Sequence, residues 1–312
     1  MIVFPKSLQE AAAATGTVRA GGTDLMERRR GLELVDLRDV EDARTIEALP
    51  GGAARIGALV PIAAIAAHDG LRASHPGLTA AAGGLATPQI RAVGTLGGNL
   101  LQRTRCWYYR SHEAVCLKKG GDQCFARAGD HLFHACFDLS PCASVHPSTL
   151  AMALLAYDAT VDVVGAAVDT VGALIGDGGD PTRDHHLPPG AVLRSVTVPP
   201  KVVGERAAYM RAISRARAEW PLVEVLARVG VQGDAIAWAK VAVGGVAGVP
   251  LRLAAVEAAL VGAPAQPEAL PKAAKLARDG AEPLPMTGYK VELLEASVLE
   301  ALELALLAEP VR

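Results

Sequence analysis

All five cysteines of the chain fall within one stretch, residues 106–142. Their spacings, C-x9-C-x7-C-x11-C-x5-C, contain no C-x-x-C pair, so neither a zinc ribbon nor a thioredoxin-type motif is expected. An odd number of cysteines in part of a long chain is not typical of a secreted disulfide scaffold. Four thiolates can bind a [4Fe–4S] cluster, and ligands on loops need no helical spacing. We therefore predict a cluster, with five reduced cysteines in a metal-free loop as the alternative.

Charged and histidine residues surround these cysteines. Lys118, Lys119 and Arg127 lie between them, as expected of a loop whose positive charge offsets an anionic cluster. The histidines show no i, i+4 pair and no other metal-ligand spacing, so we predict ordinary surface residues. These histidines are His131, His134, His146, His185 and His186.

Two glycine pairs precede the cysteines, Gly21-Gly22 within residues 17–25 and Gly97-Gly98 within residues 87–100. Paired glycines allow positive φ and remove both Cβ atoms, so backbone N–H groups can converge on an anion. One such pair is weak support, because a hairpin corner explains it equally well. Two pairs predict a clamp that holds a diphosphate from both sides. The pattern is not G-x-G-x-x-G before a helix, so a Rossmann site is not expected.

The elements around these motifs alternate between short strands and helices, which predicts an α+β or α/β first part. Ser7 and Glu10 form a capping box that starts a helix over 7–15. The last hundred residues predict an antiparallel sheet covered by helices. Strands are expected at 18–20, 34–37, 55–58, 160–164, 192–198, 209–214 and 235–243, and helices at 62–68, 78–85, 152–156, 220–227, 251–261, 269–278 and 291–307.

Composition excludes several classes of partner. The chain has 312 residues, enough for two domains, with a formal net charge of −2. This balance does not favour nucleic acid or an anionic membrane as a partner. The most apolar run, 150–175, is interrupted by Asp158, Asp162 and Asp169, so no membrane span is expected. The N-terminus lacks the features of a signal peptide, which predicts a cytoplasmic protein, or a periplasmic one if a partner subunit carries the signal.

A family resemblance rests on the glycine motifs. Ala20-Gly21-Gly22-Thr23-Asp24-Leu25 and Gly94-Thr95-Leu96-Gly97-Gly98-Asn99-Leu100 resemble the FAD-binding subunit of molybdenum hydroxylases. That family includes xanthine dehydrogenase, aldehyde oxidoreductase and carbon monoxide dehydrogenase. The likeness continues through 89–91, 244–247 and 250–252. Residues 102–110 resemble the minority with an extra [4Fe–4S] cluster, such as periplasmic aldehyde oxidoreductase and 4-hydroxybenzoyl-CoA reductase.

This resemblance implies a fold and a set of partners. The fold is α+β, with a two-part FAD-binding domain of the vanillyl-alcohol-oxidase (PCMH) type over 1–175 that carries a cluster loop at 103–146. A linker at 176–202 and a C-terminal domain at 203–312 follow. The partners are a molybdopterin-binding large subunit and a [2Fe–2S] small subunit. FAD receives electrons from the [2Fe–2S] clusters and passes them to an external acceptor. The substrate of the complex is an aldehyde, an N-heterocycle or another aromatic compound.

The resemblance also implies site residues. Ser148-Thr149 replaces a serine-aspartate pair that approaches the flavin, and Arg211 replaces a frequent lysine. Trp220 is expected to be a core aromatic, with a place near the flavin ring as the alternative. Cys106, Cys116, Cys124 and Cys142 are the implied cluster ligands. Cys136 is expected in the core, with its substitution for Cys142 as the alternative. The implied FAD-binding residues are Arg19, Ala20, Gly21, Gly22, Thr23, Asp24, Leu25, Thr87, Thr95, Gly97, Gly98, Asn99, Ser148 and Arg211.

Two other functional classes compete with this one. A stand-alone flavin oxidase of the vanillyl-alcohol-oxidase type would need a catalytic acid or base facing the flavin, and the sequence shows no clear candidate. A metal-stabilised assembly module without redox turnover would not need two glycine clamps. An electron-transfer subunit explains both motifs, and it requires no catalytic residue on this chain.

Overall fold

The computed structural model describes residues 1–25, 33–216 and 218–312, whose strands form three sheets. The smallest is parallel, with the strand order β1-β3-β2. Its strands are β1 (Ile2–Val3), β2 (Thr17–Arg19) and β3 (Leu34–Asp36). Helix α1 (Leu8–Ala13) begins at Ser7, whose hydroxyl accepts the Glu10 N–H, as the capping box predicts. The Glu10 carboxylate accepts the N–H of Lys6, one residue before the expected donor.

The second sheet is antiparallel, with the order β4-β5-β7-β6. Strand β7 confirms the strand expected at 192–198, within the range 176–202 that the resemblance implies as a linker, and it pairs with β5 and β6 on its two edges. The physical reason is its apolar side chains, most of which are buried between its neighbours. The strands are β4 (Ile46–Ala48), β5 (Ala54–Gly57), β6 (Thr160–Val164) and β7 (Val192–Val198).

Short helices pack beside this sheet and enclose the first core, which contains Leu78, Leu96 and Leu150. They are α2 (Ile62–Ala67), α3 (Asp69–Ser74), α4 (Pro76–Gly84), α5 (Pro88–Val93), α6 (Leu96–Leu100), α9 (Thr149–Ala156) and α10 (Val171–Ile175), with the 3-10 helices η2 (Leu37–Asp39) and η3 (Pro50–Gly52) nearby in the chain.

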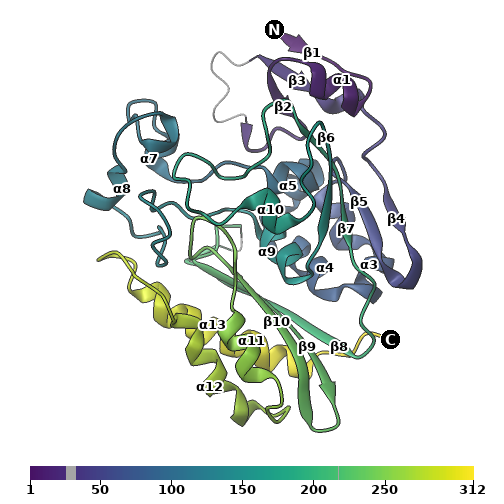
Figure 1. The fold of residues 1–312 in the computed structure, drawn as a ribbon, viewed down its shortest axis with the longest axis vertical. Coiled ribbons are helices and arrows are strands. Elements are labelled where there is room, and N and C mark those ends of the chain that lie inside the picture. The colour runs from purple at the N-terminus through teal and green to yellow at the C-terminus, as the bar shows by residue number, and fades with distance from the viewer. Residues whose placement is uncertain (26–32, 217) are drawn as a thin grey trace.

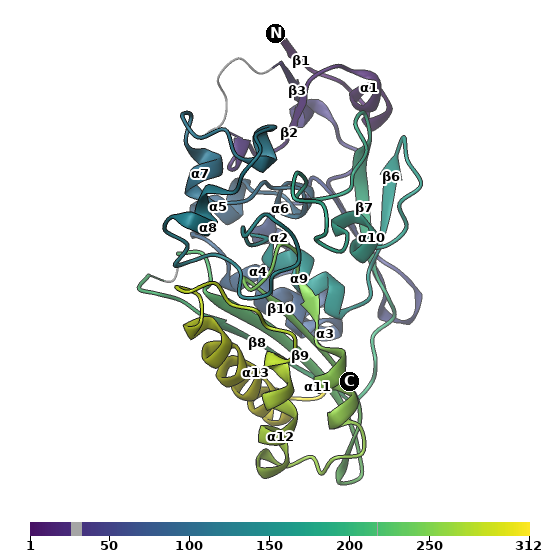
Figure 2. The ribbon, with the colours of Figure 1, turned by 60° about the vertical axis from the view of Figure 1, so that its left-hand side comes forward.

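The third sheet is antiparallel and lies between two sets of helices. Helices α11 and α13 cover one face, while α4 and α9 of the first core pack on the other (Figure 1, Figure 2). The sheet has the order β11-β10-β9-β8. Its strands are β8 (Glu205–Ala212), β9 (Val223–Gln232), β10 (Ala235–Gly244) and β11 (Leu251–Arg252), and its helices are α11 (Ala254–Leu260), η5 (Pro267–Ala269), α12 (Leu270–Ala274), η6 (Lys275–Arg278) and α13 (Tyr289–Leu307).

The helix expected at 220–227 is wrong, because strand β9 occupies most of that range. Both faces of β9 are covered, so its apolar residues do not alternate with polar ones. Such a continuous apolar run cannot be distinguished from a buried helix by periodicity alone. None of the helices in the described ranges has the length and apolar character that a membrane crossing requires.

The segment that contains α7 (Trp107–Arg110), α8 (Phe125–Ala128) and three of the five cysteines forms a separate lobe beside the first core, seen at the upper left of Figure 1. This lobe also contains η4 (Leu117–Lys119). The elements are short and joined by irregular chain. The position of the lobe therefore depends on side-chain contacts with two neighbours. One is the first core, and the other is the third sheet with its helices, which we call the C-terminal body.

Candidate functional site

The two glycine pairs meet in space. A Cβ atom on Gly21 would lie 2.0 Å from the carbonyl oxygen of Val93, so the first turn packs directly on the backbone that leads to the second. Gly22 has φ +73°, a conformation that favours glycine. The missing side chains thus permit the close approach of two segments far apart in the sequence.

The second pair is not a hairpin corner, because Gly97 and Gly98 lie in helix α6. Their N–H groups are already used inside the protein. Gly97 donates to the Ala58 carbonyl at 2.8 Å, and Gly98 donates to the Thr95 hydroxyl at 3.1 Å. In this structure the N–H groups of Gly97 and Gly98 are therefore not free to bind an anion, in contrast to the expectation. The pair mainly removes side chains from the wall of the site.

A groove of about 370 Å³ lies between the two turns, and we call it the glycine groove. Every predicted residue from Arg19 to Leu25 lines it, together with Thr95, Gly97 and Gly98. Sequence reasoning missed the opposite wall, which comes from 185–193, because that stretch was expected to be a linker. The missed lining residues are Thr17, Val18, Leu37, Ala58, Leu59, Leu101, Gln102, Arg103, His185, Leu187, Ala191, Val192 and Leu193.

The remaining predicted residues lie elsewhere. Thr87 and Arg211 line a second cavity of about 600 Å³ with Tyr209, which donates to the Glu224 carboxylate at 2.8 Å. Burial raises the pKa of Glu224 above its usual value. Asn99 and Ser148 lie outside both cavities. The Ser148 hydroxyl donates to the Asn99 side chain at 2.7 Å and caps helix α9.

Trp220 differs from its expected place in the core. Its side chain is 45% exposed, and the Arg105 guanidinium lies 4.6 Å from the centre of its ring. Arg105 also pairs with Asp24 of the glycine groove at 3.3 Å. Trp220 therefore belongs to the surface around the candidate site and not to the hydrophobic core.

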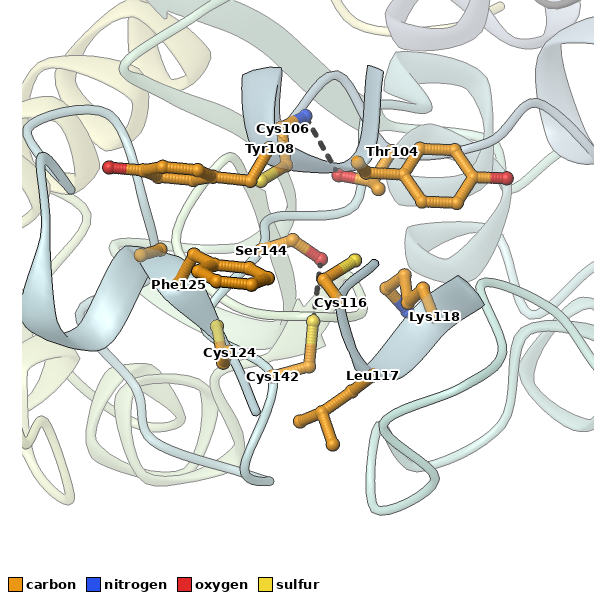
Figure 3. Close-up of a pocket in the computed structure, with 12 residues that line it drawn as sticks. Thr104, Cys106, Tyr108, Cys116, Leu117, Lys118, Cys124, Phe125, Cys142 and Ser144 are labelled. Atoms are coloured by element: carbon orange, nitrogen blue, oxygen red, sulfur yellow. Dashed lines mark hydrogen bonds between the residues drawn. The ribbon is translucent and has the colours of Figure 1, made fainter. Parts of the chain in front are cut away.

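The four predicted ligands line one small pocket, which we call the cysteine pocket. Figure 3 shows Cys106 on one side of it, with Cys116, Cys124 and Cys142 on the other. Cys136 is fully buried in the core of the C-terminal body, where burial raises its pKa to about 11. The other lining residues are Thr104, Tyr108, Tyr109, Leu117, Lys118, Phe125, Ala126 and Ser144.

The donor set of this pocket consists of four cysteine thiols. A tetrahedral zinc ion needs sulfur atoms about 3.8 Å apart, because each Zn–S bond is about 2.3 Å. No group of three or more ligands in the described residues meets the requirements of one metal ion. Four cysteines arranged around one space are the ligands that a [4Fe–4S] cluster requires. A hydrogen bond between Cys142 and Cys124 lowers the pKa of Cys124 and raises that of Cys142.

Three of the histidines predicted at the surface are buried instead: His131, His134 and His146. His131 contacts the backbone of α8 and accepts the Met286 N–H through Nε2 at 3.1 Å. Lys290 of α13 is also buried, and its ammonium donates to the Phe133 and Gly245 carbonyls at 3.1 and 2.7 Å. These polar groups attach the cysteine lobe to the C-terminal body.

Comparison with known proteins identifies the family. Residues 2–201 match the FAD-binding domain in molybdopterin dehydrogenase, and residues 208–305 match the CO dehydrogenase flavoprotein C-terminal domain. The chain belongs to the molybdenum hydroxylase family, among its FAD-binding medium subunits. This medium subunit therefore belongs to a family of oxidoreductases, and its mixed helix-and-sheet architecture is that of the CO dehydrogenase medium subunit.

Individual relatives support the same placement of this medium subunit. The aldehyde oxidoreductase FAD-binding subunit PaoB of Escherichia coli K12 is 34% identical over 253 residues, which cover 77% of this chain and 78% of PaoB. The carbon monoxide dehydrogenase of Hydrogenophaga pseudoflava has the same fold, with a TM-score of 0.75 at 22% identity over 97% of this chain and 96% of that one. For quinoline 2-oxidoreductase of Pseudomonas putida 86 the TM-score is 0.74 at 21% identity, over 98% and 96%.

Proposed function

We propose that this chain is the electron-transfer subunit of a molybdenum hydroxylase, with FAD in the glycine groove and a [4Fe–4S] cluster in the cysteine pocket. The observation that carries the proposal is the meeting of both glycine motifs on one groove, supported by the family match over 2–201. When bound, FAD supplies a carrier that exchanges electrons singly or in pairs. The chain binds and orients that carrier.

Cationic side chains on the wall of the groove support a diphosphate as its ligand. Arg19 and Arg103 both line it, and cationic side chains stabilise phosphate oxygens. Gly21 and Gly22 allow the backbone to approach the ligand without a Cβ atom in the way. Asp24 holds the base of the cysteine lobe, because its carboxylate accepts from the Arg103 N–H at 3.2 Å and from the Arg110 guanidinium at 2.6 Å. The two proposed sites are thus joined by direct contacts.

Cys106, Cys116, Cys124 and Cys142 are the proposed cluster ligands, and Cys136 is a packing residue. Lys118 lines the same pocket, where its positive charge offsets the charge of four thiolates. This position is consistent with two roles for the cluster, an electron relay and a structural support for the lobe. Reduction of the cluster during turnover would support the relay. A cluster that stays oxidised while the flavin cycles would support the structural role.

The partners we propose are a molybdopterin-binding large subunit, a [2Fe–2S] small subunit and an external electron acceptor. Since PaoB is named as part of an aldehyde oxidoreductase, an aldehyde is the substrate that we favour for the complex. We also propose a cytoplasmic location, with periplasmic export by a signal-bearing partner as the alternative. We propose domains at 1–175 and 203–312 joined by residues 176–202, with β7 of the joining segment pairing with β5 and β6 of the first domain.

The deciding experiment is an absorption and EPR spectrum of the purified chain, recorded before and after anaerobic reduction. We expect a flavin spectrum together with the signal of a reduced [4Fe–4S] cluster. Co-purification with the two proposed subunits tests the assembly. If the isolated chain oxidised aldehydes or alcohols at full rate with a dye acceptor, a stand-alone oxidase would replace this proposal.

A further inference from the structure

Asp184 lies between the two proposed cofactor sites and contacts both. Its Oδ2 atom accepts from the Nε of Arg103 at 2.5 Å, and its Oδ1 atom lies 3.0 Å from the Nζ of Lys118. Arg103 lines the glycine groove, whereas Lys118 lines the cysteine pocket. One carboxylate therefore pairs with one cation from each site.

The environment of this carboxylate makes its two partners interdependent. The Asp184 side chain is 3% exposed and that of Lys118 is 5% exposed, so water screens their charges weakly. Burial opposes ionisation of Asp184, but Lys118 and Arg103 hold its pKa below the usual value. The Lys118 ammonium has a second acceptor, the Arg183 carbonyl, at 2.6 Å. The three charged groups together carry a net positive charge beside the groove.

We propose that Asp184 couples the two pockets energetically, so that the charge of Lys118 in the cysteine pocket supports FAD binding in the glycine groove. Without Lys118, the Asp184 charge would be less neutralised, and it would hold Arg103 more strongly away from an anionic ligand. The coupling should also act in reverse, from Arg103 to the cysteine pocket. The identity of the groove's ligand rests on the function proposed above.

Two neighbouring lysines provide a matched test. Lys118→Met and Lys119→Met each remove one positive charge from η4, but the Lys119 ammonium donates to the Ser111 carbonyl and not to Asp184. FAD titrated into the deflavinated holo-chain, followed by flavin fluorescence quenching, should bind at least about fivefold more weakly to Lys118→Met. Lys119→Met and the charge-conserving Lys118→Arg should bind it like the wild type. Equal affinities of the two methionine variants would overturn the coupling.

A double variant separates charge from packing. Lys118→Met with Asp184→Asn restores the net charge of the three groups, so FAD affinity should recover to within about threefold of the wild type. If FAD affinity did not recover, the Asp184 carboxylate would be rejected as the cause of the coupling. In the reverse direction, Arg103→Met should release iron to a chelator faster than Arg55→Met, a surface control. Absence of FAD binding by the wild type would instead defeat the proposed function.

Discussion

The imidazole Nε2 of His134 lies 3.2 Å from the Sγ atom of Cys106, on the wall of the cysteine pocket. The ring is buried, and burial lowers its pKa to about 4, so it is neutral at pH 7 and carries one N–H. Its Nδ1 atom has no hydrogen-bond partner among the described residues. This arrangement favours an Nε2–H that donates to the Cys106 sulfur, and it explains why a histidine is buried in this lobe.

That hydrogen bond predicts an effect on the reduction potential of the proposed [4Fe–4S] cluster. His134→Phe keeps a ring against Trp107 but removes the donor. Because N–H···S bonds stabilise the more negative reduced cluster, the potential should fall by roughly 50 mV, about 1 kcal/mol. An EPR-monitored redox titration measures it, with the exposed His112→Phe as control. An unchanged potential in His134→Phe would contradict the hydrogen bond.

The glycine groove predicts which glycines cannot be replaced. Gly21→Ala places a methyl group where the Val93 backbone now lies, and Gly22→Val forces a branched residue into a positive-φ conformation. Both variants should be purified without flavin, as measured by the absorption spectrum and FAD content. Gly172→Ala in α10 is the control, since its Cβ would meet neighbours at 3.7 Å or more. Full flavin content in both groove variants would contradict the assignment of the glycine groove as the FAD site.

The cysteine pocket predicts a division among the five cysteines: four are needed to bind the cluster, and one is not. Serine at position 106, 116, 124 or 142 removes a thiolate ligand and should abolish or degrade the cluster. Cys136→Ser should keep iron and sulfide at wild-type levels, because Cys136 lies in the core. Iron and acid-labile sulfide analysis of all five variants tests the division. Finding zinc, or loss of iron on changing Cys136, would refute it.

A buried ion pair in the C-terminal body predicts the stability of the contact between that body and the first core. Arg228 of β9 donates to both Glu205 carboxylate oxygens at 2.7 and 2.5 Å and to the Ala156 carbonyl of α9 at 2.7 Å. Glu205→Gln leaves the buried guanidinium without its counter-ion, so the free energy of unfolding should fall by about 3–5 kcal/mol. The exposed partner of Arg278 gives a control, Glu292→Gln, which should cost less than about 1 kcal/mol. Denaturant unfolding compares the two, and similar losses would contradict the difference in burial.

His146 predicts how stability depends on pH. Its Nδ1 accepts the Ser148 N–H at 3.2 Å, and burial lowers its pKa to about 4, with Asp184 and Lys118 nearby. Between pH 6.5 and 4 the unfolded chain binds the proton more readily, so stability should fall as pH falls, by on the order of 1–3 kcal/mol. His146→Asn should flatten this part of the profile in thermal unfolding measured from pH 7 to 4. A wild-type slope in that variant would assign the effect to other groups.

Local sequence determined the features that depend on residue type and short-range spacing. The two glycine motifs identify the family, and the capping residue Ser7 starts its helix where expected. The turn and capping predictions succeed because positive φ, close backbone approach and N-capping are properties of individual residues. The family resemblance, and not local residue properties, separated Cys136 from the other four cysteines, and Cys136 lies in the core of the C-terminal body.

Tertiary structure alone decided which polar groups are buried and what they contact. Strand β9 was predicted as a helix because burial on both faces removes the alternation that marks a strand. The buried His134 and the shared carboxylate of Asp184 have no sequence signature, since their partners lie 28 and 81 residues away. Their roles arise only when distant segments exclude water together, because burial is what makes an isolated histidine or carboxylate depend on its neighbours.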